Sequence, residues 1–191
     1  IDLTRDLHFH TQTTIDTLDY SGTGLNSGSK VVFAAYGDPK RTLATEVPDI
    51  LKGLADFHRP TLVMPGVVAL QARPFVDYTH AQAELAVLQE QLNDQVPALE
   101  GVVMLVVCDD SAFVGQTLKN YLWVSFTRVN PSHDMYGIAE QVSHKHWGCL
   151  GPVVLDARIK PHHAPPVVRV PEVEQRIDRF FNQGGPLSAI G

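Results

Sequence analysis

Hydrophobic residues along the chain gather in two continuous runs. The first, residues 101–108, consists of Gly-Val-Val-Met-Leu-Val-Val-Cys and stops at Asp109 and Asp110, and the second, residues 153–155, ends at Asp156. A continuous apolar run bounded by turn-forming residues is typical of a strand that is buried on both faces. The pattern therefore predicts two buried strands, each of which ends in a carboxylate.

The clearest helical period lies in residues 77–96. Apolar side chains recur there every three or four residues, with Gln and Glu opposite: Tyr78, Ala81, Leu85, Leu88, Leu92 and Val96. This spacing predicts a helix with one buried face, which Asp77 or Thr79 caps and Pro97 ends. A shorter helix is predicted over residues 48–57, because its first residue is a proline and its apolar side chains share one face.

Further strands complete an alternation of strands and helices. Partial alternation of polar and apolar residues allows a strand within residues 11–20, a loop follows at 21–29, and residues 31–36 predict another strand. Residues 61–70 predict a strand that Pro65-Gly66 interrupts, which means a bulge, an edge strand or two short pieces. Strands that alternate with helices predict an α/β fold with a mostly parallel or mixed sheet flanked by helices.

The last part of the chain is rich in proline and lacks the alternation of strands and helices. Residues 1–165 carry the α/β pattern, whereas prolines at positions 161, 165, 166 and 171 favour an extended chain. A terminal helix is predicted from Pro171 to Asn182, where the glycines at 184 and 185 end it. We therefore expect residues 166–191 to form a Pro-rich arm and a terminal helix that packs on a neighbouring subunit.

Composition narrows the class of protein. The 191 residues are 44% hydrophobic and 19% charged, as in an ordinary globular domain. A net charge of −6 without a basic stripe argues against a nucleic-acid partner, and no apolar run approaches the roughly 20 residues of a membrane span. No signal peptide is visible, and Cys108 and Cys149 are typical of reduced thiols, so we expect a cytoplasmic protein.

Polar residues at the predicted strand ends carry the candidate chemistry. Asp109 and Asp110 can act as an acid and a base or bind a metal, but an Asp at a strand end more often caps the next helix. Arg128 follows a mixed apolar run, and a buried Arg needs a partner. The sequence favours a structural ion pair between Arg128 and one of Asp109, Asp110 or Asp156, with a substrate carboxylate as the alternative partner.

Histidines raise the question of a metal site. Five of the nine lie between His133 and His163, and His8 and His10 would share one face of a strand. The chain contains neither a His-Glu-x-x-His nor a Cys-x-x-Cys motif, and no third ligand accompanies the His8 and His10 pair. We therefore expect no metal centre, and surface or interface positions for these side chains.

The order of several short segments resembles one enzyme family. An apolar strand that ends in Asp109-Asp110 precedes Leu122-Trp123, then residues 127–131 (Thr-Arg-Val-Asn-Pro), and later residues 155–157 (Leu-Asp-Ala). This arrangement, over roughly residues 100–165, resembles the C-terminal domain of the UbiD family. Members of that family are decarboxylases, reversible in some cases, that use prenylated FMN.

The resemblance implies a role within a larger carboxy-lyase. The implied substrate is an aromatic or α,β-unsaturated carboxylic acid, and the implied cofactors are prenylated FMN, as electron sink, and a divalent metal. In the family, the catalytic network and most flavin ligands lie in an upstream domain with no counterpart in these residues. The resemblance therefore implies no catalytic residue here and no cofactor bound to this chain alone.

A loop at residues 132–139 is the implied contribution to the substrate pocket. Met135, Tyr136 and Ile138 within this loop, together with Arg128, are the pocket candidates. Some family members place a lysine on the cofactor phosphate, but residues 96–100 contain none.

The ends of the chain suggest a part of a longer polypeptide. The chain begins at Ile1 rather than Met, and UbiD-type enzymes are more than twice as long. We therefore expect the C-terminal domain of such an enzyme, inactive alone, that closes the substrate pocket and builds a homo-oligomer. The alternatives are a stand-alone assembly subunit without catalysis of its own, and a zinc-dependent hydrolase built on the histidines.

Overall fold

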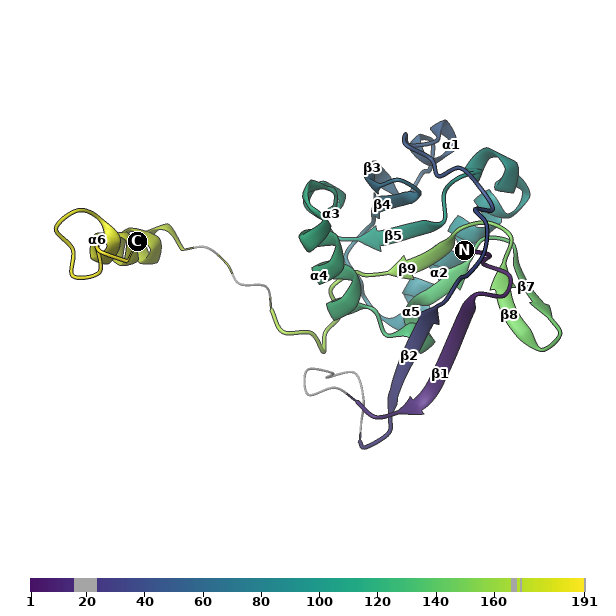
Figure 1. Ribbon diagram of the computed structural model, residues 1–191, viewed down its shortest axis with the longest axis horizontal. Coiled ribbons are helices and arrows are strands. Elements are labelled where there is room, and N and C mark those ends of the chain that lie inside the picture. Colours follow the sequence, from purple (N-terminus) through teal and green to yellow (C-terminus); the bar gives the residue numbers. More distant parts are fainter. Residues whose placement is uncertain (16–23, 166–167, 169, 191) are drawn as a thin grey trace.

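A mixed five-stranded sheet forms the centre of the computed structural model, which describes residues 1–15, 24–165, 168 and 170–190. The strand order is β3-β4-β5-β9-β6 (Figure 1). The bounds are β3 (His58–Met64), β4 (Val67–Gln71), β5 (Met104–Cys108), β9 (Val153–Asp156) and β6 (Met135–Gly137). Strands β4, β5 and β9 run parallel, and β3 and β6 join them antiparallel at the two edges. The α/β fold and the mixed sheet predicted from the sequence are confirmed.

Helices cover both faces of this sheet. Helices α1 (Asp49–Lys52) and α2 (Tyr78–Leu92) lie over one face, and α3 (Ser111–Gln116) and α4 (Leu118–Arg128) lie over the other. Successive residues of β5 point to opposite faces, so Leu105 and Val107 pack in the α2 cluster while Val106 and Cys108 pack in the α3–α4 cluster. This double burial explains the continuous apolar run at β5.

The predicted long helix is confirmed as α2. The Asp77 side chain caps it by accepting a hydrogen bond from the His80 backbone N–H at 2.9 Å. The helix ends at Leu92, earlier than predicted, because the chain tightens into the 3-10 segment η1 (Asn93–Leu99), which contains Pro97.

The helix predicted over residues 48–57 is much shorter than expected. Only Asp49–Lys52 is helical, because the chain leaves the helix at Gly53. Leu54 and Phe57 are still buried, although they lie outside the helix. The apolar spacing of these residues therefore predicted their burial correctly, but it did not predict their secondary structure.

Residues 61–70 form two strands rather than one. Strands β3 and β4 are joined by a tight turn at Pro65-Gly66, where Gly66 has a φ of +79° that a side chain would strain. Helix α3 packs closely on β3, since a Cβ added at Gly115 would lie 2.4 Å from Thr61 Cγ2. The interruption at Pro65-Gly66 thus marks two short pieces, one of the three predicted alternatives.

Two small antiparallel ribbons extend the body. Strand β1 (Leu7–Thr13) pairs with β2 (Gly28–Phe33), and β7 (Glu140–Ser143) pairs with β8 (His146–Cys149). The strand predicted within residues 11–20 is β1, which begins earlier than expected. Residues 16–20 of that prediction and residues 21–23 of the predicted loop lie outside the described residues. The β7–β8 ribbon was not predicted.

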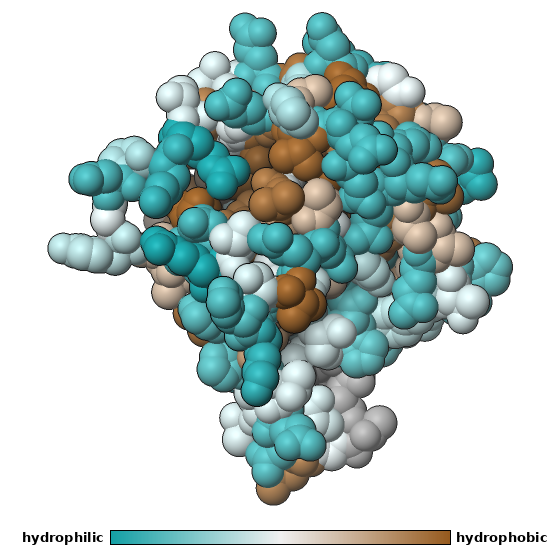
Figure 2. All heavy atoms as spheres, turned by 90° about the vertical axis from the view of Figure 1, so that its right-hand side faces the viewer, coloured by the Kyte–Doolittle hydropathy of each residue, from teal (hydrophilic) through white to brown (hydrophobic). Residues whose placement is uncertain are grey.

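The terminal helix α6 (Pro171–Phe181) is confirmed, with Pro171 at its first turn. It stands apart from the sheet body (Figure 1), and none of its residues is buried. Of the predicted Pro-rich arm and helix over 166–191, residues 166, 167, 169 and 191 lie outside the described residues. Figure 2 shows the opposite side of the body, where hydrophobic residues gather near the centre of a largely polar face. No helix within the described ranges is long and apolar enough to cross a membrane.

Candidate functional site

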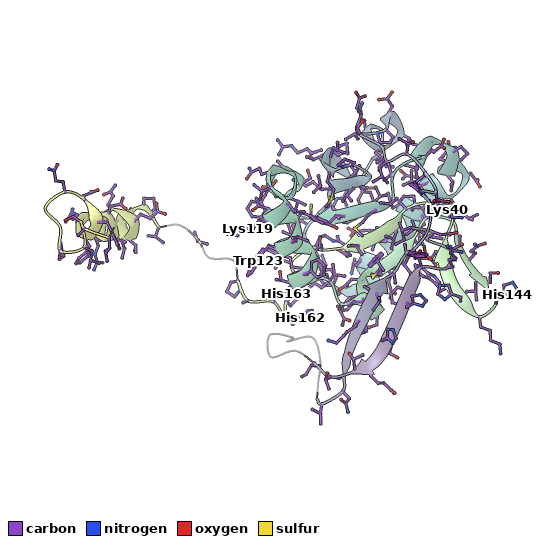
Figure 3. The ribbon with its side chains drawn as sticks, in the orientation of Figure 1. Lys40, Lys119, Trp123, His144, His162 and His163 are labelled. Carbon is purple, nitrogen blue, oxygen red and sulfur yellow. The ribbon has the colours of Figure 1, made fainter. Side chains whose placement is uncertain are left out.

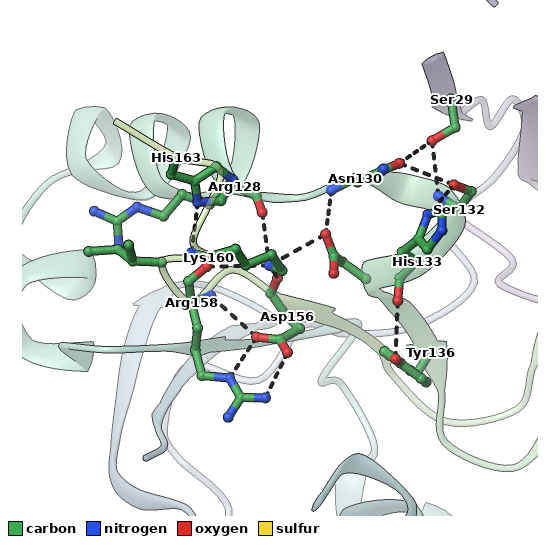
Figure 4. A network of polar contacts seen from close by, with 12 residues as sticks. Ser29, Arg128, Asn130, Ser132, His133, Tyr136, Asp156, Arg158, Lys160 and His163 are labelled. Carbon is green, nitrogen blue, oxygen red and sulfur yellow. Dashed lines mark hydrogen bonds and ion pairs between the residues drawn. The ribbon is translucent and has the colours of Figure 1, made fainter. Parts of the chain in front are cut away.

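Charged side chains gather at the carboxyl edge of the three parallel strands, where ligands of open α/β sheets commonly bind. Strands β4, β5 and β9 end side by side, since Gln71 pairs with Cys108 and Val107 pairs with Asp156. Asp109 and Asp110 follow β5, and residues 157–163 follow β9. Figure 4 shows the polar contacts that link this edge to the α5 region (α5, Pro131–Asp134).

The two aspartates after β5 have separate structural tasks. Asp110 caps α3, because its carboxylate accepts the Phe113 backbone N–H at 3.0 Å. Asp109 accepts a hydrogen bond from Arg128 Nη1 at 3.2 Å and another from the Ile159 backbone N–H at 2.9 Å. The predicted capping role and the predicted structural ion pair of Arg128 are both confirmed.

Arg158 is one of two fully enclosed cations that the structure describes at this edge. Its Nε and Nη2 donate to the two carboxylate oxygens of Asp156 at 2.9 and 2.8 Å, and both side chains are 1% exposed. Its Nη1 donates to Glu84 Oε2 at 2.5 Å and to the Arg73 carbonyl at 3.1 Å, and the guanidinium carbon lies 5.7 Å from the Phe75 ring centre. This two-pronged geometry satisfies a charge that would otherwise be costly to bury.

Lys160 is the second buried cation. Its Nζ donates to the carbonyls of Asp156 at 2.7 Å, Arg128 at 3.0 Å and Arg158 at 3.3 Å, and lies 3.4 Å from Asp134 Oδ2. Burial raises the pKa of Asp134 to about 6 and lowers the pKa of Lys160, because both charged forms lose their hydration. Lys160 therefore ties the ends of β9 and α4 to α5.

His163 and two tyrosines complete the edge. His163 Nδ1 accepts the Lys160 backbone N–H at 3.0 Å, and burial, with the nearby charges of His162, Lys160 and Arg128, lowers the pKa of His163 to about 4. Burial, followed by the carboxylates of Asp134 and Asp156, raises the pKa of both Tyr78 and Tyr136 to about 12. His163 and both phenols are therefore uncharged at neutral pH.

The pocket candidates predicted from the resemblance do not share one open surface. The region predicted as a loop at 132–139 is instead the short helix α5 followed by edge strand β6, because Met135–Gly137 pairs with β9. Tyr136 is half-buried and donates to the His133 carbonyl at 3.1 Å, and Met135 packs against the α3–α4 cluster. Ile138 is fully enclosed in the α2 cluster. No observation here tests a substrate contact by these residues or by Arg128, so that assignment stays a prediction.

Arg158 and Lys160 were missed as site residues. A signal was present, since Asp156, Arg158 and Lys160 alternate immediately after a buried strand and therefore favour one side of the chain. Continuous burial of all three could be recognised only once α2, α4 and α5 were placed around them. The polar side chains of this edge bind mainly to one another. Their charges are neutralised within the network, and these contacts fix the shape of the edge.

The described residues contain no group of three or more His, Cys, Asp or Glu side chains that could hold a metal ion. His8 does meet another histidine, with its ring 5.4 Å from that of His146, but in an edge-on contact. The residues that the structure describes therefore lack a cluster of side chains that could bind a divalent metal.

A separate shallow groove lies at the opposite, amino-terminal edge of the sheet. Its volume is about 310 Å³, and it is lined by residues that precede β5 and β9 together with two cations: Lys40, Arg41, Val96, Pro97, Leu99, Glu100, Val102, Leu150 and Gly151. None of the predicted pocket candidates lines it.

Comparison with known proteins agrees with the resemblance. The family model described as 3-octaprenyl-4-hydroxybenzoate carboxy-lyase C-terminal domain matches residues 1–35, the part that includes β1 and β2. A Chlamydia pneumoniae protein whose name makes it a subunit of 4-hydroxybenzoate decarboxylase is 28% identical over 186 residues, which cover 93% of this chain and 28% of that protein. The chain is therefore similar to the UbiD C-terminal domain at its start and to a named decarboxylase subunit along most of its length.

Further relatives match the chain along almost its whole length. An uncharacterised Chlamydia caviae protein is 28% identical over 182 residues, or 95% of this chain and 29% of the relative. An uncharacterised Chlamydia trachomatis protein is 27% identical over 177 residues, or 91% of this chain and 28% of the relative. The chain therefore spans less than a third of the length of the relatives it matches. The family model matches the start of the chain, whereas the resemblance was strongest over roughly residues 100–165.

Proposed function

We propose that this chain is the assembly and pocket-closing C-terminal domain of a UbiD-type decarboxylase or carboxylase. The observation that carries the proposal is helix α6, which stands on an arm outside the sheet body with its apolar side chains exposed. A helix with an unpaired apolar face needs a partner surface in water. The name of the Chlamydia pneumoniae relative, which is that of a decarboxylase subunit, supports the enzyme class.

The proposed substrate is an aromatic or α,β-unsaturated carboxylic acid, of which 4-hydroxybenzoate is the member that the relative's name contains. Prenylated FMN, when bound, supplies the electron sink for loss of carbon dioxide. In this proposal the flavin and its divalent metal would be held by other parts of a longer polypeptide or by a partner. This domain would contribute a rigid edge, fixed by Arg158 and Lys160, on which the β6 region is held.

Two measurements test the proposal. Sedimentation velocity of this chain at micromolar concentration should show self-association, and a purely monomeric chain would remove the assembly role. Carbon dioxide release from 4-hydroxybenzoate should be undetectable with this chain alone, even with prenylated FMN and Mn²⁺ added. Turnover by the isolated chain would show that catalytic groups lie within it, which would contradict the proposal that catalysis takes place in another part of the enzyme.

A stand-alone assembly subunit is the second candidate, and the word subunit in the name of the relative favours it. The intact mass of the polypeptide in its native source separates the two. A mass more than twice the 21.0 kDa of this chain supports a domain of one enzyme, and a mass near 21.0 kDa supports a subunit.

A further inference from the structure

The shallow groove at the amino-terminal edge of the sheet, which we call the amino-edge groove, is built from connections that are far apart in the sequence. Lys40 and Arg41 come from the connection between β2 and α1. The rest of the lining comes from η1 and the residues just before β5, and from Leu150 and Gly151 between β8 and β9. The volume of about 310 Å³ lies at the small end of the range for small-molecule sites. The groove is therefore sized for a small ligand rather than for a folded partner.

Backbone contacts hold these connections in place. The Ala44 N–H donates to the Gly101 carbonyl at 2.9 Å. Gly101 has a φ of +84°, and a Cβ added there would lie 2.7 Å from the Thr42 carbonyl oxygen, so the two connections are in close contact. The Gly151 N–H donates to the Ile138 carbonyl at 2.9 Å. The groove is thus preformed, and binding of a ligand would require little ordering of the chain.

Apolar side chains form most of the groove. Leu99 is 2% exposed and Val102 is 1% exposed, and both belong to the α2 core cluster, so they form the floor. Leu150 is 55% exposed and lies at the rim, and Val96 and Pro97 add further apolar surface. A ligand with an apolar body would remove part of this surface from water, which favours binding.

The charged residues of the lining are two cations and one carboxylate, Glu100, which leaves one net positive charge. Across the ranges that the structure describes, Lys40 and Arg41 form no hydrogen bond or ion pair, so both charges are available to a ligand. Burial, followed by Glu140, raises the pKa of the Cys149 thiol to about 12, and the charge of Arg41 opposes this shift. The Arg41 charge therefore acts close to the start of the β8–β9 connection. A ligand with one negative charge matches this lining, whereas Glu100 would repel additional negative charge.

We propose that the amino-edge groove binds a small monocarboxylate with an apolar body of about one ring, such as benzoate. Arg41 and Lys40 pair with the carboxylate, and the apolar floor contacts the ring. The site lies at the opposite edge of the sheet from the network of Arg158 and Lys160. The inference goes beyond the proposed function, because it follows from the lining residues and requires neither assembly nor catalysis.

A ligand series tests the chemistry of the groove. Titration of the ¹⁵N-labelled chain with benzoate, followed by ¹H–¹⁵N NMR, should show saturable shifts at the backbone N–H groups of Arg41, Val102 and Gly151. The dissociation constant should be on the order of 1 mM, because a ligand of about nine non-hydrogen atoms makes few contacts in a shallow groove. Benzyl alcohol, which lacks the charge, and acetate, which lacks the ring, should each bind at least about fivefold more weakly. Equal binding of acetate, shifts centred on Arg128 and Tyr136 instead, or no saturable shift at about tenfold higher benzoate would each overturn the proposal.

Matched variants test the location of the site. Lys40→Gln and Arg41→Gln should each raise the benzoate dissociation constant about threefold by removing one charge, and Leu150→Ser should do so by removing apolar contact. The control Lys119→Gln removes the same charge from an exposed lysine on the other side of the body (Figure 3) and should leave the constant unchanged. Circular dichroism should show that all four variants stay folded.

Two outcomes of the variant series would contradict the proposal. If Lys119→Gln weakens benzoate binding as much as Lys40→Gln does, the attraction comes from the overall charge of the chain and the groove is not the site. If benzoate does not bind and Lys40→Gln instead weakens self-association in sedimentation velocity, a second copy covers the groove and the ligand assignment is wrong.

Discussion

Replacement of Arg158 by methionine tests whether the carboxyl edge is held by buried charge pairing. In the folded chain Arg158 and Asp156 are each 1% exposed and share two hydrogen bonds of 2.9 and 2.8 Å. Arg158→Met keeps most of the side-chain volume and leaves the Asp156 carboxylate buried without its counter-charge. Glu84 is 32% exposed and can regain water. Loss of one partner of a buried ion pair costs about 3–5 kcal/mol, and we expect a loss of unfolding free energy in this range.

Arg73 provides a matched control within the same chain. It also forms an ion pair, with Asp56 at 3.0 Å, but its side chain is 74% exposed, so Arg73→Met should cost less than about 1 kcal/mol. Urea unfolding at pH 7, followed by far-UV circular dichroism, measures both variants against the unaltered chain. The double variant Arg158→Met with Asp156→Asn should be more stable than Arg158→Met alone, because the unpaired charge is gone. The reasoning is refuted if Arg158→Met costs no more than Arg73→Met, or if Asp156→Asn recovers nothing.

Three further predictions follow from the described contacts. The pKa of His163 is lowered to about 4 in the folded chain from an ordinary value near 6.5, so the unfolded chain binds the proton first and stability should fall as pH drops through this window. Because His163 is partly exposed, the expected loss of unfolding free energy is about 1–2 kcal/mol. Urea unfolding at pH 7.5 and at pH 4.5 should show this loss, and the loss should be smaller in His163→Gln. Asp110→Ala should cost about 1 kcal/mol by removing the α3 cap, and thermal unfolding should place it near the Asp77→Ala variant of the α2 cap. Burial raises the pKa of the Cys108 thiol to about 12, so a thiol reagent at pH 8 should label Cys108 only when urea unfolds the chain. Rapid labelling without urea would contradict the burial of Cys108 in β5.

Local signals predicted most of the elements correctly. The helix at residues 77–96, the buried strands at β5 and β9, the terminal helix and the cap at Asp110 depend on apolar period and on side chains a few residues away. The helix at 48–57 was too long, because apolar spacing that reports burial does not require helical backbone. The loop at 132–139 proved to include an edge strand, since three residues of β6 gain their structure from pairing with β9, a partner distant in sequence.

The sequence by itself determined the α/β pattern, the terminal helix and the resemblance to the UbiD C-terminal domain. Each of these depends on periodicity or on the order of short segments. Only the tertiary structure decided that Arg158 and Lys160 are enclosed, that Arg128 pairs with Asp109, and that α6 stands away from the body. Charged residues look alike in sequence whether they lie in water or in the core. Their environment is set by neighbours that the fold brings from α2, α4 and α5, and burial then decides whether a charge pair fixes the structure or contributes little.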